Sequence, residues 1–125
     1  MVLIITPYYA AALAVFYVAL AVLVIRQRFK NRVGLGDGQK PDLVTAIRVH
    51  GNFAEYVPLL LVLLLLLEIQ QAPVWQLHLI GNLTLGGRLL HAIGLNKTQG
   101  TSAPRFLGMV STFVALLASA VFLVA

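Results

Sequence analysis

The stretch that decides the fold is AIRVHGNFAEYVPLLLVLLLLLE, residues 46–68. It begins with charged and polar residues and continues into an almost unbroken apolar run. Arg48, Asn52 and Glu55 recur at spacings of four and three residues, so on a helix they share one face. The segment predicts a membrane helix that carries a guanidinium and a carboxylate toward one end.

The composition of the whole chain supports a membrane protein. Of its 125 residues, 60% are apolar and 10% are charged, whereas soluble domains carry about 25% charged residues. A soluble domain of this length cannot enclose so much apolar side chain, because a large share of its residues must lie at the surface. We therefore expect an integral membrane protein.

Several classes of site are excluded or not expected. The chain has no cysteine, which excludes disulfides, thiolate metal sites and a cysteine nucleophile. His50, His78 and His91 do not form a spaced cluster, so no metal site is expected. The net charge of +5 comes from cations beside apolar spans, which favours membrane topology over nucleic acid as its explanation.

The hydropathy pattern predicts an all-α protein, a single four-span transmembrane domain folded as a four-helix bundle. A hydrocarbon core of ~30 Å needs about 20 helical residues. We expect helices at about 2–28, 42–70, 74–95 and 104–124. Glycine- and proline-containing segments separate them, among them the basic stretch RQRFKNRVGLGDGQKP at 26–41.

The cations predict an orientation. Those around the first loop are Arg26, Arg28, Lys30, Arg32, Lys40 and Arg48, and those around the third are Arg88, Lys97 and Arg105. The second loop and both termini carry none. The positive-inside rule then places loops one and three in the cytoplasm and both termini outside.

The polar residues of the helices gather at this cytoplasmic end. They are Arg48, His50, Asn52, Glu55, Arg88, His91 and Arg105. Ionisable groups cost ~2.5–3.5 kcal/mol each at the centre of a span and less near its ends. One interpretation is structural, with Glu55 paired to Arg48 or Arg88 to hold the bundle together.

The other interpretation is a site for a small, polar, net-anionic ligand. Arginine binds carboxylates through two parallel hydrogen bonds, while Glu55 suits an ammonium group and Asn52 an amide. A tripeptide thiol such as glutathione fits this set. A guanidinium beside its thiol favours the reactive thiolate, so such a site needs no protein nucleophile.

The segment RVHGNFAEYVPL, residues 48–59, resembles the second-helix signature of the MAPEG family, the membrane-associated proteins of eicosanoid and glutathione metabolism. The family pattern is Arg-x-(His/Gln)-x-Asn-x-x-Glu-Tyr-x-Pro, and this chain matches it in order with Arg48, His50, Asn52, Glu55, Tyr56 and Pro58. The loop VGLGDG is similar to that of bacterial members, RLLHAIG is similar to the third helix of the family, and APRF is similar to the start of its fourth helix. The resemblance extends over about residues 1–125.

The resemblance implies a left-handed bundle that assembles as a homotrimer, with glutathione bound between subunits near the cytoplasmic face. It assigns Arg105 to stabilising the thiolate. It assigns glutathione contacts to Arg48, Asn52, Glu55 and Tyr56, with His50, Arg88 and His91 at recurring family positions and Arg28 or Arg26 matching an arginine that ends the first helix. A bacterial inner membrane is the expected location.

Three functions are open. The favoured one is a glutathione-dependent transferase or peroxidase that acts on lipophilic electrophiles or lipid hydroperoxides. The alternative is a non-catalytic lipid-binding or scaffold protein of the same fold. A small multidrug exporter is less favoured, because it needs an acid deep in a span, and Glu55 lies among arginines that repel cations.

Overall fold

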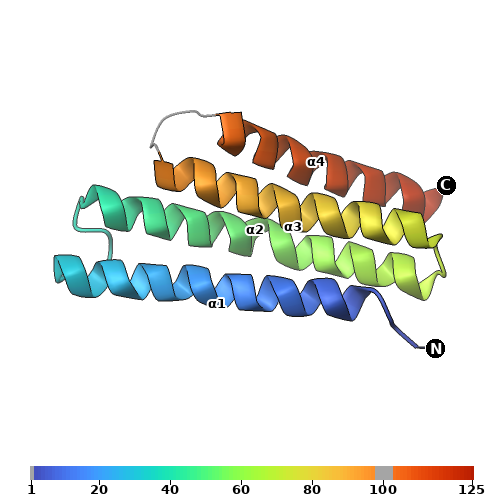
Figure 1. Cartoon of the computed structure of the whole chain (residues 1–125), viewed down its shortest axis with the longest axis horizontal. Coiled ribbons are helices and arrows are strands. Elements are labelled where there is room, and N and C mark those ends of the chain that lie inside the picture. The colour runs from blue at the N-terminus through green and yellow to red at the C-terminus, as the bar shows by residue number, and fades with distance from the viewer. Residues whose placement is uncertain (1, 98–102) are drawn as a thin grey trace.

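The chain folds into four helices that lie side by side and alternate in direction (Figure 1). The structure, a computed structural model, describes residues 2–97 and 103–125. The helices are α1 (Thr6–Asn31), α2 (Pro41–Ile69), α3 (Val74–Lys97) and α4 (Ala103–Val124). No strand occurs in these two ranges. The predicted all-α four-helix bundle is confirmed.

Three of the helices, α1, α2 and α4, are long and apolar enough to cross a bilayer, and the chain is an integral membrane protein. α3 is less apolar because it carries Thr84, Arg88 and His91, all of which are buried. It still runs beside α4 along the bundle (Figure 1). These three side chains therefore face protein rather than lipid.

The cations collect at one end of the bundle. Figure 1 shows the α1–α2 connection, the end of α3 and the start of α4 at this end, and both termini with the α2–α3 connection at the other. Cations of the described residues here include Arg26, Arg28, Lys30, Arg32, Lys40, Arg48 and Arg105. We call this the basic end.

Prolines and a left-handed residue mark the helix boundaries. Pro7 and Pro41 lie in the first turns of α1 and α2, where the backbone nitrogen needs no partner. α1 ends at Asn31, and the next residue, Arg32, caps it with a φ of 56° and a backbone N–H that bonds back to the Arg28 carbonyl. The chain then reverses into the loop 32–40.

The opposite end is closed by a carboxylate. Glu68, near the end of α2, accepts hydrogen bonds of 2.7–2.9 Å from the backbone N–H groups of residues 4–6. Ile5, the residue before α1, has no side-chain capping bond. Glu68 thus caps α1 from a neighbouring helix, because the first N–H groups of a helix have no partner within it.

α3 and α4 form the most extensive helix pair, and glycines bring them close. A Cβ on Gly108 would lie 2.6 Å from the Gly87 carbonyl oxygen and 2.7 Å from the His91 nitrogen. A Cβ on Gly94 would lie 2.5 Å from the Arg105 backbone nitrogen. This close approach sets His91 and Arg105 on adjoining backbones.

Candidate functional site

Arg88 on α3 is the centre of a polar cluster that joins three helices. The residue is 2% exposed. Its Nη1 donates to Asn52 Oδ1 on α2, and its Nη2 donates to Thr112 Oγ1 on α4 at 2.7 Å. Nη2 also lies 3.5 Å from the Met109 sulfur. The guanidinium carbon is 5.7 Å from the centre of the Tyr56 ring, within the range of a cation–π contact. We call these five residues the Arg88 cluster.

The Arg88 cluster holds a positive charge among neutral partners. A buried charge is costly unless it is hydrogen-bonded, and here an amide oxygen, a hydroxyl and an aromatic face supply the compensation. Within the described part of the chain, Arg88 Nε has no hydrogen-bond partner. The cluster therefore fastens α2, α3 and α4 together, which is the role that the structural interpretation gave to a pair with Glu55.

Glu55 instead pairs with Arg48, two turns earlier on α2. Arg48 Nη1 lies 3.8 Å from Glu55 Oε1, and the two side chains are 58% and 56% exposed. Both lie on the same side of α2 as Asn52, but Asn52 is 8% exposed and turns inward to Arg88. The face predicted from the spacing therefore carries two features. The Asn52 amide points inward, and the ion pair between Arg48 and Glu55, which we call the Arg48–Glu55 pair, is exposed.

The depth of this pair follows from helix geometry. Glu55 is 14 residues from Ile69, the last residue of α2, or ~21 Å at 1.5 Å per residue. Arg88 is equally far from Val74, the first residue of α3. If the ~30 Å hydrocarbon core begins at that end, both groups lie ~9 Å inside it. Arg48 is 21 residues from Ile69, or ~32 Å, and so lies at the edge of the core, while its partner Glu55 lies deeper.

His50 faces α1 rather than the Arg48–Glu55 pair. Its ring stacks on Tyr17, with 4.9 Å between ring centres, and Tyr17 stacks in turn on Phe53 at 5.3 Å. His50 is half-buried. This aromatic stack holds α1 and α2 together in the half of the bundle nearer the basic end.

His91 and Arg105 lie where α3 meets α4. His91 is 5% exposed, and a Cβ on Gly108 of α4 would lie 2.7 Å from its backbone nitrogen. Arg105 lies in the first turn of α4 and is half-buried. The close approach of α3 and α4 therefore brings His91 and Arg105 to the same junction.

Arg28 lies at the end of α1, where its hydrogen bonds go to the loop. Nη1 donates to the carbonyls of Gly36 at 2.7 Å and Val33 at 3.4 Å. Its assignment to glutathione stays a prediction. In this protomer its role is to hold the loop against α1.

Two residues with clear roles did not stand out in the sequence. Thr112 completes the Arg88 cluster, and Glu68 caps α1. A threonine in an apolar helix gives no signal of its own, and the partners of Glu68 are backbone groups. The one sequence feature that pointed to such a role was the position of Glu68 at the end of the leucine run.

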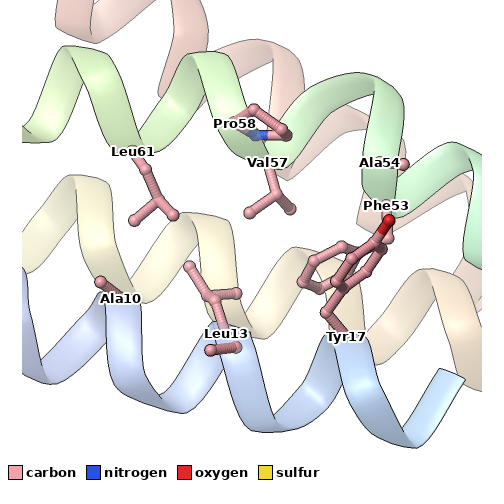
Figure 2. Close-up of a pocket in the computed structure, with 9 residues that line it drawn as sticks. Ala10, Leu13, Tyr17, Phe53, Ala54, Val57, Pro58 and Leu61 are labelled. Carbon is pink, nitrogen blue, oxygen red and sulfur yellow. The ribbon is translucent and has the colours of Figure 1, made fainter. Parts of the chain in front are cut away.

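An apolar groove of about 290 Å³ lies between α1 and α2. Figure 2 shows Leu13 and Val57 in its middle and the Tyr17 and Phe53 rings nearer the basic end. Pro58 also lines it. Since α1 and α2 are both membrane spans, the groove can receive an acyl chain or another lipophilic group.

The comparisons with known proteins agree with the signature on α2. The profile of the MAPEG family matches residues 6–125. The chain belongs to the MAPEG family. It is 38% identical over 109 residues to the inner membrane protein YecN of Escherichia coli K12, covering 87% of this chain and 82% of that protein. The YecN protein of Escherichia coli O6:H1 strain CFT073 matches with the same values. No solved structure matches the chain.

Proposed function

We propose that this MAPEG protein is a glutathione-dependent transferase or peroxidase that acts on lipophilic electrophiles or lipid hydroperoxides. The observation that carries the proposal is the Arg48–Glu55 pair. It offers a cation and an anion that are more than half exposed beside a rigid polar cluster. Glutathione carries two carboxylates, one ammonium group and a thiol, and so presents the complementary charges.

The depth of Glu55 supports a site between subunits. An exposed carboxylate ~9 Å inside the hydrocarbon core, with its partner Arg48 at the edge of the core, is costly if it faces lipid. It is tolerated where it faces another subunit or a water-filled hollow. We infer that copies of this chain assemble as a homotrimer and enclose the pair, with glutathione entering from the basic end.

Each residue is assigned a binding role according to its charge. Arg48 binds a carboxylate of glutathione, Glu55 receives its ammonium group, and Tyr56 lies beside them on α2. The Arg88 cluster keeps α2 in place against α3 and α4. Bound glutathione supplies a thiolate as the nucleophile toward an electrophilic carbon or a peroxide oxygen.

Arg105 is the residue proposed to stabilise the thiolate. It lies in the first turn of α4, where the positive end of the helix dipole also favours an anion. Arg105→Ala is expected to weaken the thiolate absorbance that appears when glutathione is added to the purified protein, with the oligomer unchanged. An unchanged thiolate signal removes Arg105 from the mechanism.

The proposed location is a bacterial inner membrane, with loops one and three in the cytoplasm and both termini outside. The inner-membrane name of the YecN proteins supports the location. The cations at the basic end support the orientation. Cysteines introduced at either terminus should react with a membrane-impermeant thiol reagent in intact cells, whereas one in loop 32–40 should not.

The decisive experiment is a calorimetric titration of glutathione into the detergent-solubilised protein. Glu55→Gln and Arg48→Gln should each weaken binding by tenfold or more, since a charge-assisted hydrogen bond contributes ~1.5–3 kcal/mol. Asp42→Asn is the matched control, because Asp42 forms a comparably exposed ion pair with Lys30 at 2.9 Å. Unchanged affinity in both site variants, or an equal loss in the control, overturns the proposed site.

A second candidate, a non-catalytic lipid-binding or scaffold protein, is supported by the apolar groove of Figure 2. This function needs no thiolate. Turnover of a chlorinated aromatic acceptor with glutathione separates the two. Lipid binding without glutathione binding or turnover would favour the second candidate.

A further inference from the structure

A second hollow lies at the end of α1, formed by residues other than the Arg48–Glu55 pair. It encloses about 430 Å³ and is lined by Ile25, Arg28, Phe29, Arg32, Val33 and Gly34. The lining combines two guanidinium groups with three apolar side chains and includes no acid. This combination suits a ligand that has an anionic group joined to an apolar body.

The loop that follows this hollow in the chain is held in a defined conformation. The Arg28 side chain bonds to the Gly36 and Val33 carbonyls through Nη1 alone. Gly38 has a φ of 56°, and a Cβ there would lie 2.7 Å from Val33 Cγ2. The loop therefore packs on Val33 and closes over the end of α1.

The hollow lies at the level of the lipid headgroups. Ile25 is 19 residues after Thr6, the first residue of α1, or ~29 Å along the helix. This distance matches the ~30 Å hydrocarbon core. Beyond that level Phe29 is 80% exposed, and the Arg32 side chain is exposed at the left-handed turn. An aromatic residue and arginines at this depth suit the membrane interface.

We propose that this hollow is a binding site for an anionic phospholipid of the leaflet at the basic end. Arg28 and Arg32 hold the phosphate, which guanidinium groups bind well, and Ile25 and Phe29 contact the start of the acyl chains. Basic pockets on this side of membrane proteins recognise anionic headgroups. Orientation in the membrane requires only the cations, whereas the apolar lining and the ordered loop are suited to a lipid.

The test is native mass spectrometry of the detergent-solubilised protein with phosphatidylglycerol or phosphatidylcholine of identical acyl chains. Phosphatidylglycerol should be retained preferentially. Arg32→Gln should lower its retention about tenfold, the effect of removing one hydrogen bond between charged groups in the site. Glutamine tolerates the backbone, since Gln39 and Gln71 have φ values of 57° and 59° in this chain.

Arg26→Gln is the matched control. It removes the same charge from the same segment, but Arg26 does not line the hollow. Its phosphatidylglycerol retention should equal that of the unmodified protein. Equal losses in the two variants, or equal retention of the two lipids by the unmodified protein, overturn the proposal. So does displacement of the lipid by millimolar inorganic phosphate, which would show a site for free anions.

Discussion

Arg88 and Glu55 lie at a similar depth, yet the surroundings of the Arg88 cluster and of the Arg48–Glu55 pair differ. Arg88 is enclosed and reaches α2 and α4 through hydrogen bonds. Arg48 and Glu55 are more than half exposed, and both belong to α2. Arg88 joins the helices of the bundle, whereas Arg48 lies on its surface. Burial within the single chain therefore distinguishes Arg88, which has a structural role, from Arg48, which is proposed to bind a ligand.

The largest effect is expected from removing an acceptor of Arg88. Asn52→Leu leaves the buried guanidinium with one hydrogen-bond acceptor fewer, and a hydrogen bond to a charged group contributes ~1.5–3 kcal/mol. The free energy of unfolding should fall by about this amount. Denaturant titration of the detergent-solubilised protein, followed by circular dichroism, measures it.

Asn82→Leu is the control for this change. Asn82 lies on the same bundle but is exposed, so the identical substitution removes no partner from Arg88. If the two leucine variants unfold at the same denaturant concentration, the Arg88 cluster is not the tie between the helices.

A smaller effect is expected at the opposite end of α2. Glu68→Ala removes the cap of α1, and loss of an N-cap costs ~0.5–2 kcal/mol. The thermal unfolding midpoint should fall, with the earliest hydrogen exchange at residues 4–6. Glu55→Ala is the control on the same helix. Equal changes in both variants would contradict the division between a structural carboxylate and an exposed one.

The helical fold was predictable because it depends on hydropathy. The apolar stretches that form α1, α2 and α4 are long enough to span a bilayer, and lipid leaves few alternatives to a helix for such segments. Helix boundaries were predictable where single residues restrict or free the backbone, such as Pro41 at the start of α2 and the glycines of loop 32–40. These signals require no knowledge of neighbouring helices.

The division of the polar residues was not predictable, because it depends on how helices are rotated against one another. Spacing predicted one shared face of α2 for Asn52 and Glu55, and the structure divides it into a buried Asn52 and an exposed Glu55. It could not show that α3 would present Arg88 to Asn52, or that Thr112 would complete the contact. Glu68 was missed for a related reason, since backbone N–H groups are its partners and they have no sequence signature.

The smallest effect is expected from the Arg48–Glu55 pair itself. A double-mutant cycle with Arg48→Gln and Glu55→Gln should give a coupling energy below about 1 kcal/mol, as measured for ion pairs in contact with water. Denaturant titration of the four proteins without glutathione supplies the cycle. The small value is expected even though Glu55 lies at hydrocarbon depth, because the proposed assembly places the pair in a water-filled hollow.

A coupling of several kcal/mol would contradict this arrangement. Such a value is expected where water is excluded, since the attraction between charges rises as the local dielectric constant falls. The pair would then be a structural tie comparable to the Arg88 cluster. Glu55 would be engaged without a ligand, and the proposed ammonium contact would have to displace Arg48. A weak pair that nevertheless changes glutathione affinity is the result that separates a binding role from a structural one.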